Sequence, residues 1–350
     1  MRTSCALIVV FTILLGSCAS LADPPITLES PPEGPDTPAT DSPAVDDDGP
    51  GESPPGAAAG RPGPVARVEI DTLYARSPDP ANEDPGELLG IERRAVLAEV
   101  NRIRALHGLA AVAYDERYDE EVTAAALIIA ANAAMTHYPD DSMIGYSSAG
   151  AAGAQTSNIH ISFSTNATAE PSIAHVRNWL IDDGVPSLGH RRWILDPFLP
   201  SIAYGRVDGR PAVSSQWSYV GGSALKVVHD EDARLDAAHT PEFVAYPYGE
   251  YPVEYANPRW YWSFAVVADP SGRWANQAVD LSGARVSVHA GNRKLAVADI
   301  RADNEGFGLP NSLQWRVEGA RTGERYSVVV DNVNVNGDAR RYEYDVLIVE

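Results

Sequence analysis

Apolar residues recur at helical spacing in three stretches of the first half of the chain. The first stretch predicts a long helix that begins at Asp84, with Pro85 at its first helical position, and ends before Gly108. Its inward positions are Leu89, Val96, Val100 and Ile103. Two more helices are predicted over residues 115–135 and 171–183, separated by a loop-rich segment. The strands predicted in this half are 159–163, 202–207 and 224–228.

Apolar and polar residues alternate in short segments after residue 240, which is typical of strands with one solvated face. Six strands are predicted, at 243–246, 261–266, 285–288, 313–317, 326–330 and 342–348. Asn336-Gly337 predicts a hairpin turn before the last strand, in which Tyr342 and every second residue after it face one way. Six or seven strands in about 110 residues indicate an immunoglobulin-like sandwich. We interpret the aromatic-rich stretch 246–262 as packing between two domains rather than as a platform for glycans.

The first eighteen residues have the features of an export signal. The apolar run 6–15 is too short to span a bilayer but has the length of a signal-peptide core. It ends in Leu15-Gly16-Ser17-Cys18, which resembles a bacterial lipoprotein signal and makes Cys18 a candidate for lipidation; an ordinary secretory signal is the alternative. Because Cys5 leaves with the signal, we expect no internal disulfide in the mature protein.

An acidic, proline-rich stretch separates this signal from the first helix. Residues 23–64 hold twelve prolines and nine acidic residues, with almost nothing large and apolar to bury, so we expect disorder. The predicted organisation is a signal peptide over 1–18, a disordered linker over 19–83, a mixed α/β domain over 84–235 and an all-β domain over 236–350.

The charge of the chain excludes one class of partner. Lys and Arg number 27 against 48 Asp and Glu, a formal net charge of −21, so a polyanion would be repelled and no nucleic-acid partner is expected. The sequence contains no G-x-S-x-G, no H-E-x-x-H, no phosphate-binding glycine loop and no paired-cysteine metal motif. A serine hydrolase is therefore unsupported, and the expected membrane contact is the lipid anchor alone.

Several motifs occur in an order that is similar to that of a known superfamily. They are Val100-Asn101-x-x-Arg104, Ser157-Asn158-Ile159, Trp179, Gly189-His190-Arg191-Arg192-Trp193-Ile194-Leu195-x-Pro197 and Gly205. This set resembles the CAP or SCP superfamily of cysteine-rich secretory proteins, antigen 5 and pathogenesis-related proteins, in its bacterial branch. The resemblance covers about residues 88 to 235. It implies an α/β fold, an α-β-α sandwich, here followed by the all-β immunoglobulin-like sandwich.

The resemblance also implies a cleft lined by two histidines and two acids. His137 and His190 match the histidines and Asp182 matches one acid, whereas Ser157 stands in the place of the other. These two histidines and Asp182 are thus candidate metal ligands for a divalent cation such as zinc, and candidate catalytic groups, with Ser157 and His160 as cleft neighbours. For His137, capping of a helix end is the alternative.

These features lead to one hypothesis and two alternatives. We expect an exported, lipid-anchored protein of the bacterial cell envelope that binds an envelope component or a small ligand through the histidine-lined cleft, without catalysis. The first alternative is a metal-assisted hydrolase that uses the same cleft. The second is a lipid or sterol carrier, as the resemblance to eukaryotic members of the family implies. In the main hypothesis, the β domain is a spacer or an adhesion module.

Overall fold

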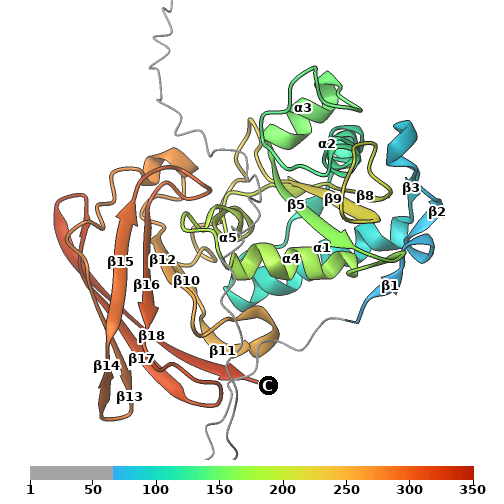
Figure 1. The fold of residues 1–350 in the computed structure, drawn as a ribbon. Coiled ribbons are helices and arrows are strands. Elements are labelled where there is room, and N and C mark those ends of the chain that lie inside the picture. Colours follow the sequence, from blue (N-terminus) through green and yellow to red (C-terminus); the bar gives the residue numbers. More distant parts are fainter. Residues whose placement is uncertain (1–65) are drawn as a thin grey trace, which may run out of the picture. The chain divides into compact units, whose positions relative to one another are not determined.

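The computed structural model describes residues 66–350, so the predicted signal peptide, Cys18 and most of the predicted linker lie outside the described residues (Figure 1). The helices are α1 (Gly90–Leu106), α2 (Asp119–Asn132), α3 (Ser148–Gln155), α4 (Ser172–Ile181) and α5 (Gly189–Ile194). The strands up to β9 are β1 (Val68–Glu69), β2 (Tyr74–Arg76), β3 (Glu87–Leu88), β4 (Ala113–Tyr114), β5 (Ser157–Ser164), β6 (Thr168–Ala169), β7 (Ser201–Ile202), β8 (Tyr204–Gly209) and β9 (Tyr219–Lys226). The later strands are β10 (Phe243–Tyr246), β11 (Gly249–Pro252), β12 (Trp262–Val266), β13 (Arg285–Ala290), β14 (Arg293–Leu295), β15 (Val297–Asp303), β16 (Ser312–Val317), β17 (Arg325–Val335) and β18 (Asp338–Val349).

The central sheet of the α/β domain (elements β1–β9) has three antiparallel strands in the order β5-β9-β8. One face of this sheet lacks side chains at the positions where helix α2 crosses it. A Cβ added to Gly222 would lie 2.3 Å from the carbonyl oxygen of Ala126, and one added to Gly205 would lie 2.4 Å from the carbonyl of Val122. Helix α3 approaches α2 in the same way at Gly153. Glycine is required here because the backbones touch.

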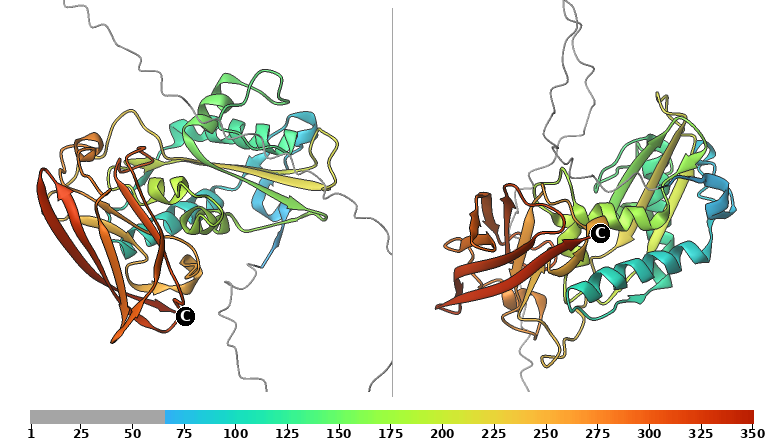
Figure 2. Two further views of the ribbon diagram at one scale, coloured as in Figure 1. Left: turned by 60° about the vertical axis from the view of Figure 1, so that its left-hand side comes forward. Right: turned by 90° about the horizontal axis from the view of Figure 1, so that it is seen from below.

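Helices α4 and α1 lie on the opposite side of the sheet (Figure 2). Helix α4 is tied to the sheet by Trp179, whose Nε1 donates to the carbonyl oxygen of Ile159 over 3.0 Å. Helix α1 packs beside α4 through fully buried apolar side chains, namely Val96, Val100 and Ile103. Helices thus cover both faces of the sheet, which confirms the predicted α/β fold with an α-β-α arrangement.

The sandwich domain (elements β10–β18) consists of two sheets, β10-β12-β16-β15 and β11-β18-β17-β13-β14. Strands β17 and β18 form the predicted hairpin, and its turn residues Asn336 and Gly337 both have positive φ, 55° and 93°. The alternation predicted for β18 is confirmed, because every second residue is buried: Tyr342, Tyr344, Val346 and Ile348. Strand β11 is parallel to β18 and was not predicted.

The two domains share one hydrophobic core. Buried residues of α1 and α4 belong to the same cluster as those of both sheets of the sandwich. The predicted packing role of the aromatic stretch is confirmed for its main members, which are at most 2% exposed: Tyr246, Tyr251, Tyr255, Tyr261 and Trp262. The sandwich domain therefore packs against the α/β domain through a shared core, whereas a simple spacer would not.

The folded part starts earlier than the sequence predicts. Strands β1 and β2 and two 3-10 helices lie within the predicted linker. Tyr74 is buried there, and its hydroxyl donates to Asp208 over 2.6 Å. Asp84 does not cap a helix. Its carboxylate accepts from the backbone N–H of Gly86 over 3.0 Å, and Gly86 has a φ of 68°, so the chain turns there and α1 begins only at Gly90.

Several other helices differ from prediction. Asp115 caps a short 3-10 helix, and α2 follows from Asp119 to Asn132 instead of reaching Met135. Helix α3 lies in the segment predicted as loop, and α5 carries the His190 motif, for which no helix was predicted. Helix α4 ends at Ile181, because Asp182 adopts a left-handed conformation with a φ of 55°.

Candidate functional site

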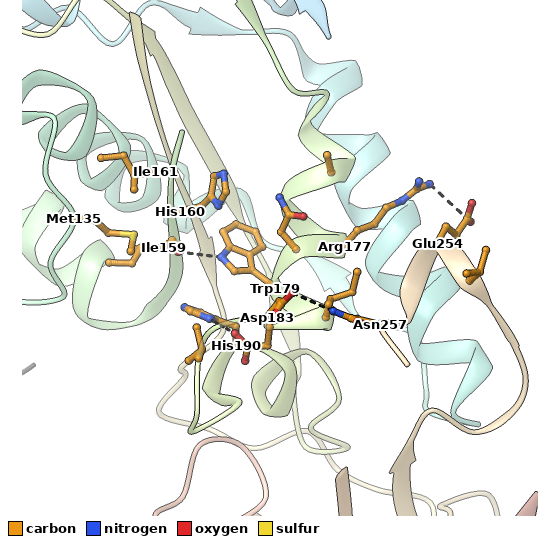
Figure 3. A pocket seen from close by; sticks show the side chains of 16 residues that line it. Met135, Ile159, His160, Ile161, Arg177, Trp179, Asp183, His190, Glu254 and Asn257 are labelled. Carbon is orange, nitrogen blue, oxygen red and sulfur yellow. Dashed lines mark hydrogen bonds and ion pairs between the residues drawn. The ribbon is translucent and has the colours of Figure 1, made fainter. Parts of the chain in front are cut away.

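A cleft of about 750 Å³ lies beside α4 and α5 (Figure 3). Strand β5 supplies His160 to its wall, α4 supplies Trp179, and α5 supplies His190. In Figure 3, the indole of Trp179 stands between the two imidazoles. The sandwich domain completes the lining with Val253, Glu254 and Asn257. His160 and His190 thus both line this cleft.

Asp182 holds the ring of His190 in one orientation. Its Oδ1 lies 2.8 Å from Nδ1 of His190, and its Oδ2 accepts from the backbone N–H of Arg191 over 3.2 Å. The Asp182 side chain is buried, whereas the His190 side chain is 20% exposed. Because a carboxylate accepts from Nδ1–H, the neutral ring carries its lone pair on Nε2. His190 can therefore accept a hydrogen bond or take up a proton at Nε2.

The sandwich domain fixes the acidic end of α4. Nε1 of Trp260 donates to the carbonyl oxygen of Asp182 over 2.8 Å, and Nδ2 of Asn257 donates to Asp183 over 3.0 Å. These contacts reach the backbone that carries the Asp182–His190 pair. The sandwich thus positions the site as well as lining it.

The two arginines that follow His190 do not line the cleft. The guanidinium of Arg191 donates to the carbonyl oxygens of Leu180 and Tyr261 and lies 3.7 Å from the ring centre of Tyr246. Arg192 forms an ion pair with Asp303 at 2.9 Å. Burial lowers the pKa of both arginines below its ordinary value. Their guanidinium groups form hydrogen bonds and an ion pair at the contact between the domains, so they do not face a cation in the cleft.

The other predicted residues lie in different surroundings. Nδ1 of His137 donates to the carbonyl oxygen of Ala154 over 2.7 Å, and His137 is outside the cleft lining. Ser157, at the place of the missing acid, is buried at the start of β5, and its hydroxyl also lies outside that lining. Both carboxylate oxygens of Asp182 are engaged, so Asp182 is better placed to orient His190 than to bind an ion. An ion shared by His137 and His190 stays a prediction.

A second group of possible ligands includes His160 in the wall of the cleft. His160, Glu170 and His175 each offer a ligand atom, and these atoms all lie within 4.8 Å of one another, so the group could hold a metal ion. Burial lowers the pKa of His160 to about 4 and that of His175 well below its ordinary value. Both imidazoles are therefore neutral at pH 7. No sequence pattern singled out Glu170 or His175, because these residues meet His160 only through the fold.

The rest of the lining combines an apolar surface with more acidic than basic side chains. Apolar side chains from β5, α4 and three other segments cover part of the wall: Met135, Ile159, Ile161, Trp179, Ile181, Val185 and Val253. Three acidic residues and one arginine also line the cleft: Asp182, Asp183, Glu254 and Arg177. Arg177 is bound by Glu99 over 2.6 Å. This surface suits a neutral or cationic molecule with an apolar body, because an anion would meet the acidic groups.

Comparison with known proteins agrees with the motifs. No helix among residues 66–350 is long and apolar enough to cross a membrane. Residues 97–220 match the CAP family model, described as the cysteine-rich secretory protein family. No curated protein matches the chain. The matched segment spans α1 to β9 and includes His160, Asp182 and His190. Residues 97–220 are thus a CAP-type segment, and the α/β domain that contains them is called the CAP domain below.

Proposed function

We propose that this protein is an exported, lipid-anchored binding protein of the bacterial cell envelope, whose cleft holds a small neutral or cationic ligand. The observation that carries the proposal is the cleft of about 750 Å³ that the CAP domain and the sandwich domain line together. A volume of this size is typical of small-molecule sites. The ligand's apolar body lies against Trp179, and a donor group of the ligand bonds to Nε2 of His190.

Two features support binding without turnover. The cleft lining among the described residues includes no serine, threonine, cysteine or lysine side chain that could act as a nucleophile. The acid that the family places near the histidines is Ser157 here, and Asp182 is engaged by His190 and Arg191. His190 then serves as a fixed hydrogen-bond acceptor.

One observation favours hydrolysis as a second candidate. The contact of 2.8 Å between Asp182 and His190 is the arrangement of a carboxylate that orients a general base. In that case, Nε2 of His190 takes a proton from water, and Asp182 stabilises the resulting imidazolium. Hydrolysis of an ester or peptide substrate that is abolished in His190→Ala would establish this candidate in place of simple binding.

A fluorescence titration tests the proposed binding. The probe is 1-aminoanthracene, a neutral aromatic amine, compared with the anionic 1-anilinonaphthalene-8-sulfonate. We expect the full chain to bind the amine more tightly than the anion. His190→Ala should weaken amine binding about 2- to 10-fold, the value of one hydrogen bond. His239→Ala is the control, because His239 is exposed and lies outside the lining. Preference for the anion, or equal affinity in both variants, would refute the proposal.

The anchor is tested through Cys18. Expressed with its signal in a bacterium, the wild-type chain should fractionate with membranes, and Cys18→Ala should appear in the soluble fraction. Cys18→Ala protein that is cleaved and still stays with membranes would rule out lipidation at this residue.

A further inference from the structure

The face of the central sheet that meets α4 carries a row of polar side chains. His160 of β5 pairs with Ser223 of β9, and Ser223 pairs with Arg206 of β8. Paired residues of neighbouring strands point to the same face, so the three side chains form one line across the sheet. His175 of α4 lies above this line, since its Nδ1 is 2.9 Å from the hydroxyl of Ser223. A polar layer is therefore buried between sheet and helix.

Two imidazole nitrogens in this layer have no hydrogen-bond partner within the described chain. They are Nε2 of His160 and Nε2 of His175, and both atoms are buried. Leaving a buried polar atom unpaired costs about 1–3 kcal/mol, so two of them side by side indicate a missing partner. The rings lie 4.4 Å apart between centroids with their planes tilted by 32°. This near-parallel placement does not let one ring donate in its plane to the other.

His175 is held in the form that a metal ligand requires. Two hydroxyl oxygens, of Tyr204 and Ser223, each lie 2.9 Å from its Nδ1. When Nδ1 carries the hydrogen, it donates to one of these oxygens, and Nε2 presents its lone pair. Metal-binding histidines have such a partner on their second nitrogen in most proteins.

Glu170 completes a set of two imidazoles and one carboxylate. Its ligand atom lies within 4.8 Å of those of His160 and His175. The side chain is half-buried, and its contact with Nδ2 of Asn178 is 3.4 Å long. The carboxylate of Glu170 is therefore free to move by the roughly 1–2 Å that coordination of an ion at about 2.1 Å requires.

The charges around the group permit a cation. The positive charge of Arg206 acts on both imidazoles, and Asp208 binds Arg206 through two contacts of 2.6 and 3.1 Å. That pair is neutral as a whole. Glu170 then contributes a net negative charge, and both imidazoles are neutral at pH 7.

We propose that His160, Glu170 and His175 bind a divalent first-row transition metal ion in the wall of the cleft. For an ion about 2.1 Å from each Nε2, the centroid separation of 4.4 Å corresponds to an angle of about 90° at the ion. This angle fits three ligands on one face of an octahedron, with the remaining positions filled by water. The site shares no residue with the predicted set of His137, Asp182 and His190. It also does not depend on a ligand in the cleft.

Titration of the full, untagged chain with Co²⁺ tests this site. Calorimetry should show one ion per chain, and the weak visible absorption of the complex should be that of octahedral Co²⁺. Glu170→Gln should weaken binding at least about 10-fold, because it removes the charged ligand but keeps the side chain's shape. Its half-buried position lets this variant fold, which an unchanged circular dichroism spectrum would verify. His190→Ala is the matched control and should bind Co²⁺ as the wild type does.

Three outcomes would overturn the proposal. The wild-type chain does not bind Co²⁺, or Glu170→Gln binds it with unchanged affinity, or His190→Ala loses the ion while Glu170→Gln retains it. The last result would place the ion at the cleft histidine instead. Because the fluorescent amine reports on the cleft separately, failure of the metal site leaves the proposed ligand binding untouched.

Discussion

His107 provides a test of how the CAP domain and the sandwich domain meet. It follows α1 and is 3% exposed, because strands of the sandwich cover it. Nδ1 of His107 donates to the carbonyl oxygen of Ala245 over 2.8 Å, and the hydroxyl of Tyr251 lies 3.0 Å from Nε2. Burial lowers the pKa of His107 to about 3, although the bond to Ala245 acts in the opposite direction. The folded protein therefore holds this imidazole neutral.

The sign of the pH dependence follows from this pKa. In the unfolded chain, the His107 pKa is about 6.5, so between pH 6.5 and about 3 the unfolded state binds the extra proton. The contribution of His107 to stability is present above pH 6.5 and is lost as the pH falls. At about 1.4 kcal/mol per pH unit, the free energy of unfolding drops by about 2 kcal/mol between pH 6.5 and pH 5 from this residue alone.

Urea unfolding at pH 7 and pH 5 measures the effect. Wild type should lose about 2 kcal/mol more than His107→Gln between the two pH values. Glutamine keeps a donor and an acceptor but does not titrate. NMR titration of the His107 ring gives an independent value for its pKa. A pKa near 6.5, or equal pH dependence in both proteins, would refute the conclusion that the sandwich seals this position.

Two further substitutions test the packing of the central sheet against α2 and the packing between the two domains. Gly222→Ala should lower the free energy of unfolding, measured by urea titration, by about 3 kcal/mol, because the new Cβ would lie 2.3 Å from the carbonyl oxygen of Ala126. The control, Gly272→Ala, should be nearly neutral in that titration, because its new Cβ would have no neighbour closer than 3.8 Å. Arg191→Met should cost about 3 kcal/mol by thermal or urea unfolding, because buried carbonyl groups of both domains lose their donor. A loss below about 0.5 kcal/mol for either Gly222→Ala or Arg191→Met would contradict the contacts described.

Much of the fold follows from local patterns, and its exceptions have physical causes. The β17–β18 hairpin was predictable because Asn336-Gly337 and the alternation in β18 agree. Helix α3 was not, since the two glycines of its sequence SAGAAGAQ offset the helix preference of its alanines and eight residues are too few to form a stable helix alone. Its glycines serve tertiary packing, and a Cβ on Gly153 would lie 2.1 Å from a carbonyl oxygen of α2. Contact with another helix decides the structure there.

The residues of the candidate site also fall into two groups, those that sequence motifs indicate and those that only the fold brings together. His160, Asp182 and His190 were identified because they lie in or near sequence motifs. Glu170 and His175 belong to no motif, and their meeting with His160 depends on how α4 crosses β5. Local patterns could not predict that the sandwich domain lines the cleft, because Val253 lies 48 residues after Gly205, the last of the family motifs, and reaches the site only through domain packing.

Val253→Trp tests most directly whether the sandwich domain completes a binding cleft. Val253 is half-buried in the cleft wall, so a tryptophan there should fill part of the cleft. The measurement is the affinity of Val253→Trp for 1-aminoanthracene, with its melting temperature as a check on folding. We predict that the affinity falls at least about 10-fold while the melting temperature is unchanged. Wild-type affinity in a folded variant would contradict the account.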